Sequence, residues 1–164
     1  MNKKYNSNLN GEIIYLTCGA AASLAITFNA LLNKGDEVIV FTPCFPEYKV
    51  YIESANGIFV ASKPKIPSFD MDLDDVANLI NKNTKIVLIN SPNNPTGVMY
   101  SEETIISLSK LLKKKEEEYN HPIFLVSDEP YRELLFDNQK YPFVTNYYKN
   151  SIICYSFSKS LSLP

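Results

Sequence analysis

Residues 152–160 have the sequence Ile-Ile-Cys-Tyr-Ser-Phe-Ser-Lys-Ser, an apolar run followed by a lysine that hydroxyl groups surround. The apolar run predicts a short buried strand. If Lys159 stays at the end of that strand, burial lowers the pKa of its amine, because desolvation disfavours the charged form. A neutral amine can attack a carbonyl carbon and hold it as a Schiff base. Taken alone, such a lysine more often leaves the sheet into solvent, so its role depends on the rest of the chain.

Further apolar runs predict a sheet of several strands that alternate with helices. Strands are predicted at residues 12–17, 37–41, 58–61, 84–90, 123–126 and 151–155. Helices are predicted at residues 20–33 and 47–55, from a cap at Asp72 to about 81, and from a start at Ser101. Several strands are continuous Val, Ile and Leu runs. The expected fold class is therefore α/β, a three-layer αβα sandwich with a mainly parallel sheet.

Unusual residues follow four of these strands. Gly19, Asn94, Asp128 and Lys159 each come shortly after a different apolar run. In open parallel sheets, ligands bind outside the carboxyl ends of the strands. These residues are therefore expected to meet in one site, although each of them alone is a weak signal.

The composition excludes several classes of function. The chain has 164 residues and a net charge of −2, so neither nucleic acid nor an anionic membrane is expected as a partner. No apolar run approaches the roughly 18 residues of a membrane span. The scattered Cys18, Cys44 and Cys154 indicate buried thiols in a reducing, cytoplasmic setting, not a disulfide framework or zinc site. His121 is the only histidine, which disfavours a histidine-based triad or metal site.

The residues after the strands are those that an aldehyde cofactor on Lys159 would need. Pyridoxal phosphate is the usual cofactor of this kind, and its ring acts as an electron sink. An anion has to keep its pyridine nitrogen protonated, and Asp128 is placed for that. Its phenolic oxygen needs hydrogen-bond donors, which Asn94 and Tyr131 can supply.

The phosphate group and the ring face have candidate partners as well. Gly19-Ala20-Ala21 precedes a predicted helix, where backbone N–H groups and the helix dipole attract anions, and Ser156 can add a hydroxyl. Phe45, in a proline-rich loop, can stack on a flat ring. Each feature also has a simpler interpretation as a turn residue, a tight strand–helix joint or a packed aromatic, and only the combination points to a cofactor.

In this combination the chain resembles the fold-type I, pyridoxal phosphate-dependent aminotransferases of class I and II, the aspartate aminotransferase family. The motifs that carry the resemblance are Gly19-Ala20-Ala21, Gly35-Asp36-Glu37-Val38, Asn90-Ser91-Pro92-Asn93-Asn94-Pro95-Thr96-Gly97, Ser127-Asp128-Glu129-Pro130-Tyr131 and Ser156-Phe157-Ser158-Lys159. The resemblance covers nearly the whole chain from about Ile13.

The resemblance implies transfer of an amino group between an amino acid and a 2-keto acid. It implies that Lys159 is the catalytic residue, which binds pyridoxal phosphate and shuttles protons, and that Asp128 is the partner of the pyridine nitrogen. It also implies the contacts to the phenolic oxygen and ring face that were inferred above. The cofactor-binding residues are expected to be Gly19, Ala20, Ala21, Phe45, Asn94, Asp128, Tyr131, Ser156, Ser158 and Lys159, and no metal is expected.

The resemblance is to the middle of such an enzyme. Residues 1–11 are expected to be a polar lead-in, and residues 12–164 an incomplete large domain that ends just after the lysine. The small domain, with the arginine that clamps the substrate carboxylate, has no counterpart, and neither has the phosphate-binding arginine that normally follows the lysine. We therefore expect a fragment with reduced or no activity, from a parent enzyme that is a cytoplasmic homodimer.

Three alternatives stay open at this point. The same fold and lysine also serve pyridoxal phosphate-dependent lyases and decarboxylases. Some transcription regulators carry an aminotransferase-like domain that senses the cofactor, although residues 1–11 are too short for a DNA-binding domain. The third alternative is a non-catalytic remnant of such an enzyme, which still binds the cofactor or has lost it.

Overall fold

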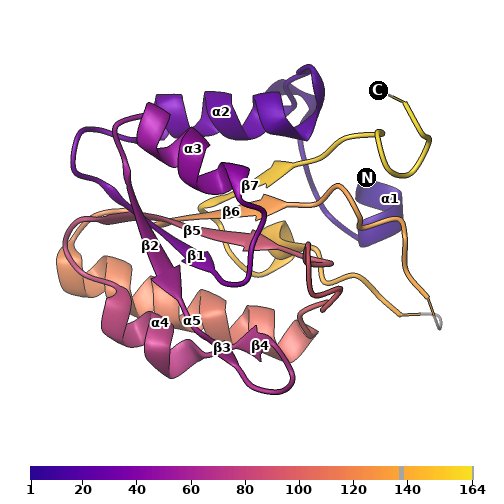
Figure 1. The fold of residues 1–164 in the computed structure, drawn as a ribbon. Coiled ribbons are helices and arrows are strands. Elements are labelled where there is room, and N and C mark those ends of the chain that lie inside the picture. The colour runs from indigo at the N-terminus through magenta and orange to yellow at the C-terminus, as the bar shows by residue number, and fades with distance from the viewer. Residues whose placement is uncertain (137–138, 164) are drawn as a thin grey trace.

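The centre of the molecule is a parallel sheet of five strands. The computed structural model describes residues 1–136 and 139–163. All neighbouring strands of the sheet run parallel, as Figure 1 shows. Their spatial order is β2 (Ile58–Ser62), β1 (Glu37–Phe41), β5 (Thr84–Asn90), β6 (Phe124–Asp128) and β7 (Ser151–Cys154).

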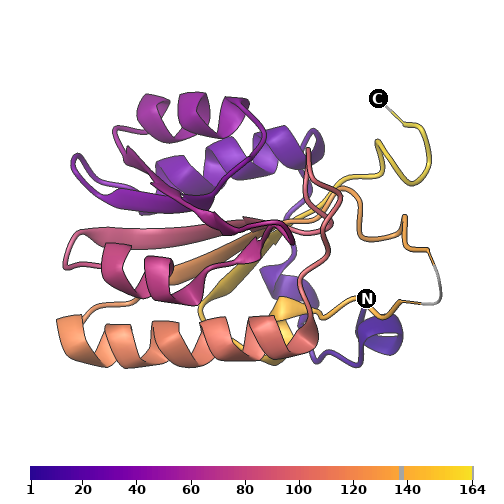
Figure 2. The same cartoon turned by 60° about the horizontal axis from the view of Figure 1, so that its bottom comes forward.

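Helices cover both faces of this sheet. Helices α2 (Gly19–Leu31) and α3 (Glu47–Ser54) lie on one face, and α4 (Leu73–Leu79) and α5 (Glu102–Tyr119) lie on the other (Figures 1 and 2). Each face has its own buried apolar cluster, with Leu24 and Phe28 under α2 and with Ile105 and Leu108 under α5. The predicted three-layer αβα sandwich is thus confirmed.

The helix starts follow from local chemistry. Asp72 accepts hydrogen bonds from the backbone N–H groups of Asp74 and Asp75, at 3.1 and 3.2 Å, and so caps α4 as predicted. Ser101 accepts a hydrogen bond from the backbone N–H of Thr104 at 3.1 Å and caps α5. Such caps satisfy N–H groups that the first helical turn leaves without partners.

The remaining elements are short. They are the helix α1 (Asn2–Tyr5), the 3₁₀ helices η1 (Gly11–Ile13) and η2 (Val144–Asn146), and the antiparallel pair β3 (Pro64–Lys65) and β4 (Asp70–Met71). Two of them, η2 and β4, each add a buried residue, Val144 and Met71, to the apolar cluster under α5. Helix α1 lies at the carboxyl end of the sheet in Figure 1 and contacts the segment that follows β6 through Glu133. Within the described residues, no helix is long and apolar enough to cross a membrane.

The predicted strand at residues 12–17 is wrong. Residues up to Ile13 form η1, and the chain from there to α2 pairs with no strand among the described residues. Leu16 is 98% exposed and Tyr15 is 82% exposed. The apolar pattern favoured an extended backbone, but an extended segment becomes a strand only when a neighbour completes its hydrogen bonds.

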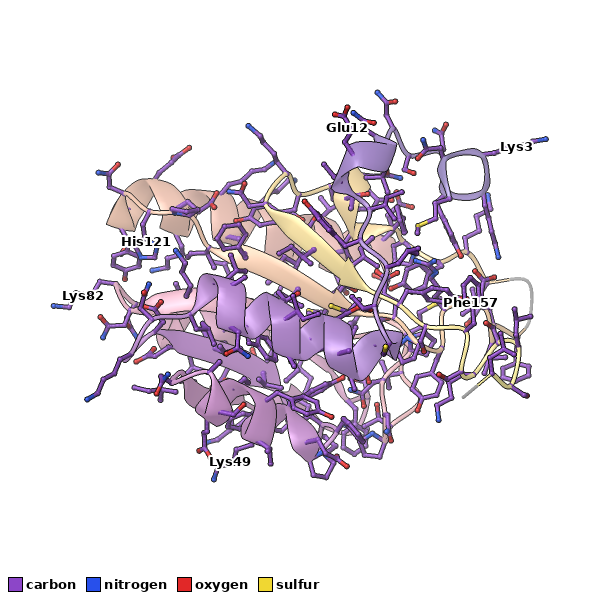
Figure 3. The ribbon with its side chains drawn as sticks, turned by 90° about the horizontal axis from the view of Figure 1, so that it is seen from above. Lys3, Glu12, Lys49, Lys82, His121 and Phe157 are labelled. Atoms are coloured by element: carbon purple, nitrogen blue, oxygen red, sulfur yellow. The ribbon has the colours of Figure 1, made fainter. Side chains whose placement is uncertain are left out.

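The parallel arrangement brings the carboxyl ends of all five strands of this sheet to one edge. In the register of the sheet, Asn90 at the end of β5 lies beside Asp128 at the end of β6, and Asp128 lies beside Cys154 at the end of β7. Figure 3 shows Phe157, which follows β7, at this end of the molecule, and His121 and Lys82 at the opposite end. Residues that follow the strands therefore gather at a single edge, where a ligand site is expected.

Candidate active site

A cavity of about 350 Å³ lies at the carboxyl edge of the sheet. Its volume is within the range of small-molecule sites. Every residue that the sequence predicted for the site lines this one cavity. Those residues are Gly19, Ala20, Ala21, Phe45, Asn94, Asp128, Tyr131, Ser156, Ser158 and Lys159.

Asp128 is the buried acid of the cavity. Its side chain is 6% exposed, and burial raises its pKa to about 6, against a hydrogen bond from Tyr48 that lowers it. The Tyr48 hydroxyl donates a hydrogen bond to Oδ2 at a distance of 2.5 Å. The other oxygen, Oδ1, is buried without a hydrogen-bond partner among the described residues. A buried acceptor without a donor is costly, so the cavity offers a place for a donor that the described residues do not provide.

The loop with Asn94 is tied to the strand that ends in Asp128. Asn90 donates from Nδ2 to the backbone oxygen of Asp128 at 3.0 Å, and its Oδ1 accepts from the backbone N–H of Asn94 at 2.6 Å. The peptide bonds before Pro92 and Pro95 are both cis. Asn90 thus links the two loops on one wall of the cavity.

The first turn of α2 forms another wall. The helix begins at Gly19, whose φ of +81° is in the region that glycine adopts without strain. The backbone N–H groups of Ala20 and Ala21 belong to the first turn, in which no intrahelical acceptor exists. These groups, with the positive end of the dipole of α2, favour an anion.

Lys159 lines the cavity but is exposed. The expectation that it is buried at the end of its strand is therefore wrong. Strand β7 ends at Cys154, and the chain then makes a turn in which Leu161 donates from its backbone N–H to the Phe157 oxygen at 2.9 Å. This turn carries the lysine beyond the sheet, to the mouth of the cavity.

Aromatic and hydroxyl groups complete the lining. The ring of Phe45 is half-buried and meets the ring of Tyr48 edge-on, with centroids 5.5 Å apart. Tyr131 is half-buried, while Ser156 is 8% exposed. No group of three or more His, Cys, Asp or Glu side chains with metal-binding geometry occurs in the described part of the chain.

Comparison with known protein families gives a match along the whole chain. Residues 1–164 match the family Aminotransferase class I and II. This chain belongs to that family.

Individual aminotransferases show how far the likeness extends. The probable aspartate aminotransferase of Methanocaldococcus jannaschii is 33% identical over 159 residues, which are 97% of this chain and 40% of that protein. The aspartate aminotransferase of Thermotoga maritima is 37% identical over 138 residues, which are 84% of this chain and 35% of that protein. The chain thus spans about 40% of the length of the curated relatives that it matches.

Solved structures of aminotransferases have the same fold. The crystal structure of an aminotransferase from Eubacterium rectale is similar with a TM-score of 0.97 and 50% identity, over 99% of this chain and 41% of that one. The crystal structure of the Thermotoga maritima aspartate aminotransferase has a TM-score of 0.90 and 33% identity, over 99% of this chain and 42% of that one.

The structure adds two residues of the aminotransferase chain that the sequence analysis missed, Tyr48 and Asn90. Both line the cavity, and both hydrogen-bond to Asp128. Tyr48 lies in the first turn of α3, and its backbone N–H donates to the oxygen of Phe45, in the loop before the helix, at 3.2 Å. Asn90 is a polar residue at the end of an apolar strand, which is itself a signal for a site at the sheet edge.

The residues present fit pyridoxal phosphate, the cofactor that the resemblance to this family implies. Oδ1 of Asp128 is a buried acceptor without a partner among the described residues, which a protonated pyridine nitrogen would provide. The first turn of α2 offers N–H donors to a phosphate group. Lys159 on the same cavity offers an amine, and Phe45 offers a ring face.

Proposed function

We propose that this chain is the cofactor-binding part of an enzyme that transfers an amino group between an amino acid and a 2-keto acid with pyridoxal 5′-phosphate. The observation that carries the proposal is the buried Asp128, with an unsatisfied oxygen, on the same cavity as Lys159 and the start of α2. When bound, the cofactor supplies an aldehyde that condenses with amines and a ring that accepts electrons.

The role of Asp128 is to hold a proton on the pyridine nitrogen. A cation next to a carboxylate favours the charged form of the acid, so contact with the ring lowers the pKa of Asp128 below its value of about 6 in the protein alone. The Tyr48 hydroxyl holds Oδ2 at 2.5 Å, which leaves Oδ1 for the ring.

The phosphate and ring contacts are divided between separate elements. The backbone N–H groups of Ala20 and Ala21, next to the turn at Gly19, bind the phosphate together with the hydroxyls of Ser156 and Ser158. The proposed phosphate site therefore consists of neutral hydrogen-bond donors and the positive end of the α2 dipole.

Asn94, Tyr131 and Phe45 orient the ring in this proposal. The amide of Asn94 and the hydroxyl of Tyr131 donate to the phenolic oxygen, while Phe45 packs on the ring face. Because these side chains come from the loops after β1, β5 and β6, the sheet edge fixes their relative positions.

Lys159 is the catalytic residue. Its Nζ would hold the cofactor through the aldehyde, and the free amine would move a proton at the substrate. Its exposed position at the mouth of the cavity lets it change partners without unfolding the turn that carries it.

The substrates, the assembly and the location of the whole enzyme are part of the proposal. The relatives named above are aminotransferases, which favours transfer over the lyase and decarboxylase alternatives. We propose an amino acid and a 2-keto acid as substrates, a homodimer as the assembly and the cytoplasm as the location. The three free cysteines agree with a reducing compartment.

The test is an absorption titration of the purified chain with pyridoxal phosphate, followed by borohydride reduction and peptide mapping. We expect a new near-UV or visible band and a label on Lys159. Lys159→Ala should lose both, whereas Lys149→Ala, which removes another exposed lysine, should keep both. A label spread over several surface lysines would contradict the proposal.

The reaction type needs a second assay. Formation of a keto acid from the amino acid that depends on an added acceptor keto acid supports transfer, and formation without an acceptor indicates a lyase. Because the chain spans about 40% of the length of its relatives, the same assay should be made on a protein that extends over their full length.

A further inference from the structure

The turn after β6 presents side chains in two directions. Asp128 and Tyr131 line the cavity. Glu129 and Arg132, which alternate with them, do not line it and are buried, with exposures of 0% and 3%. The backbone N–H of Glu129 donates to the Cys154 oxygen at 2.8 Å, which ties this turn to β7. Whatever holds Glu129 and Arg132 therefore also sets the positions of the two cavity residues.

Glu129 and Arg132 form a buried ion pair. Nη1 of Arg132 donates to Oε2 of Glu129 at 2.9 Å. Burial raises the pKa of Glu129, and the Arg132 guanidinium opposes this effect. A buried pair of this kind contributes little net stability compared with apolar residues of the same size, because both charges lose their hydration. The presence of this ion pair is better explained by the fixed relative orientation that a planar guanidinium and a carboxylate impose on the two side chains.

Three aromatic rings surround the guanidinium of Arg132. Its Cζ lies 3.8 Å from the ring centroid of Tyr155, 5.2 Å from that of Tyr5 and 5.7 Å from that of Phe143. Tyr155 comes directly before Ser156, which lines the cavity. Arg132 thus contacts both the turn after β6 and the turn after β7, the two segments that carry Asp128 and Lys159.

The N-terminal helix α1 supplies one of these rings and is itself held on this turn. The ring of Tyr5 stacks on that of Phe143, with centroids 4.7 Å apart and an angle of 10°. The Tyr5 hydroxyl donates to Oε1 of Glu133 at 2.8 Å, and Lys4 forms an ion pair with the same carboxylate. Nδ2 of Asn146 donates to the backbone oxygen of Tyr5 at 2.9 Å.

We propose that Arg132 is a positioning residue for the cofactor site and that Tyr5, from helix α1, completes the aromatic enclosure that holds it. The guanidinium plane fixes Glu129 and the ring of Tyr155, and through them the backbone that bears Asp128, Tyr131 and Ser156. The N-terminal segment is then a working part of the site although it does not line the cavity. The inference is tested by two measurements. The first, backbone amide exchange, does not depend on the proposed function, whereas the second, cofactor binding, rests on it.

The backbone readout is amide hydrogen exchange of the chain without cofactor. Arg132→Lys keeps the charge and loses the planar fork, and Tyr5→Leu keeps an apolar side chain and loses the ring and hydroxyl. We expect both to speed exchange in residues 128–134 and 154–158 by at least about tenfold, with β1 and β5 unchanged. Lys115→Met is the matched control, because Lys115 also pairs with a glutamate, Glu118, and lies over a ring, that of Tyr119, but on α5.

The cofactor readout is the affinity for pyridoxal phosphate and the visible circular dichroism per bound cofactor. We expect Arg132→Lys and Tyr5→Leu to weaken binding by about fivefold to fiftyfold and to reduce the dichroism, which reports a fixed ring orientation. Tyr5→Phe, which keeps the ring, should recover most of both. Unchanged exchange in residues 128–134 in both Arg132→Lys and Tyr5→Leu would overturn the inference.

The two proposals fail in different ways. If the unaltered chain binds no pyridoxal phosphate, the proposed function is wrong, while the exchange data still decide the role of Arg132. If the chain binds the cofactor and the variants match it in exchange, affinity and dichroism, the inference is wrong and the proposed function stands. A lower melting temperature with unchanged local exchange would mean that the cluster only stabilises the fold.

Discussion

Asp128 is a carboxylic acid that the fold buries at the end of β6, beside the Tyr48 hydroxyl. Burial dominates, so its pKa rises to about 6 from a value of 3.8 when free. Below about pH 3 the acid is neutral in both the folded and the unfolded chain. Between about pH 4 and 6 the unfolded chain releases the proton first, so the free energy of unfolding falls as the pH rises. At neutral pH, the ionised Asp128 therefore lowers the free energy of unfolding of the chain without cofactor. Asp128 is also the residue that the cofactor is proposed to contact.

Replacing this acid should stabilise the chain without cofactor. We expect Asp128→Asn to raise the free energy of unfolding at about pH 7.5 by at most about 3 kcal/mol, because an amide does not ionise. The gain should vanish at about pH 3, where the acid is neutral in both states. Urea unfolding across this range measures the effect, with the exposed Glu117→Gln as control. Equal stability of variant and original at all pH values would show that Asp128 ionises as freely as in water.

The Tyr48 hydroxyl tunes this acid. Its hydrogen bond lowers the pKa of Asp128, so Tyr48→Phe should raise that pKa further and weaken binding of pyridoxal phosphate at neutral pH by about tenfold. The pH profile of binding is the measurement, and its acidic limb should move to higher pH. Tyr51→Phe, at another cavity residue of α3, is the control. An unmoved limb would argue against the hydrogen bond.

The start of α2 shows how an element creates a binding feature from backbone alone. The turn at Gly19 has a positive φ, and it ends with the free N–H groups of Ala20 and Ala21 on the cavity. No charged side chain is needed there, because the dipole and the N–H groups attract an anion. The sequence analysis predicted this feature although the strand that it placed before Gly19 does not form, because a glycine turn and the start of a helix are local.

Gly19→Ala should damage both folding and anion binding. Space is not the obstacle, because a Cβ at Gly19 meets no atom within 4 Å, but a φ of +81° is strained for alanine. We expect a loss of about 1–2 kcal/mol in the free energy of unfolding and weaker competition of inorganic phosphate with the cofactor. Gly11→Ala, at a glycine without positive φ, is the control and should be nearly neutral. Equal losses at both positions would contradict the argument from φ.

At the scale of the molecule, the apolar surface before α2 is unusual. Ile13, Ile14, Tyr15 and Leu16 are 61%, 48%, 82% and 98% exposed. Strand β7 is the last strand of the sheet and pairs with β6 alone among the described residues. Contiguous apolar surface and unpaired strand edges both favour association of chains.

We therefore expect the isolated chain to self-associate as its concentration rises. Leu16→Lys should shift sedimentation or light scattering toward the monomer, and it should change the free energy of unfolding by no more than about 0.5 kcal/mol, because the side chain buries almost nothing. Glu12→Gln, which also raises the net charge of this segment by one unit, is the control for a pure charge effect. If both variants act alike, apolar contact is not the cause.

The amino-acid sequence alone determined the fold class, most element positions and many, but not all, of the residues that line the cavity. Strand β5 occupies residues 84–90 as predicted, because a continuous apolar run of that length is suited to a strand buried on both faces. Glycine, proline and capping residues are local signals, so the turns that end these elements could also be predicted. The motif residues then met because parallel strands all end at one edge.

The tertiary structure decided what depends on partners distant in the sequence. Tyr48 reaches Asp128, Tyr5 reaches Arg132, and the segment at 12–17 stays unpaired, while Lys159 is exposed at the cavity mouth. Periodicity and propensity describe a residue and its near neighbours, whereas burial, pKa and strand pairing depend on atoms that only the folded chain brings together. The residue types thus indicated the chemistry of the site. The pKa of Asp128 and the contacts that hold the site residues in place depend on the folded structure.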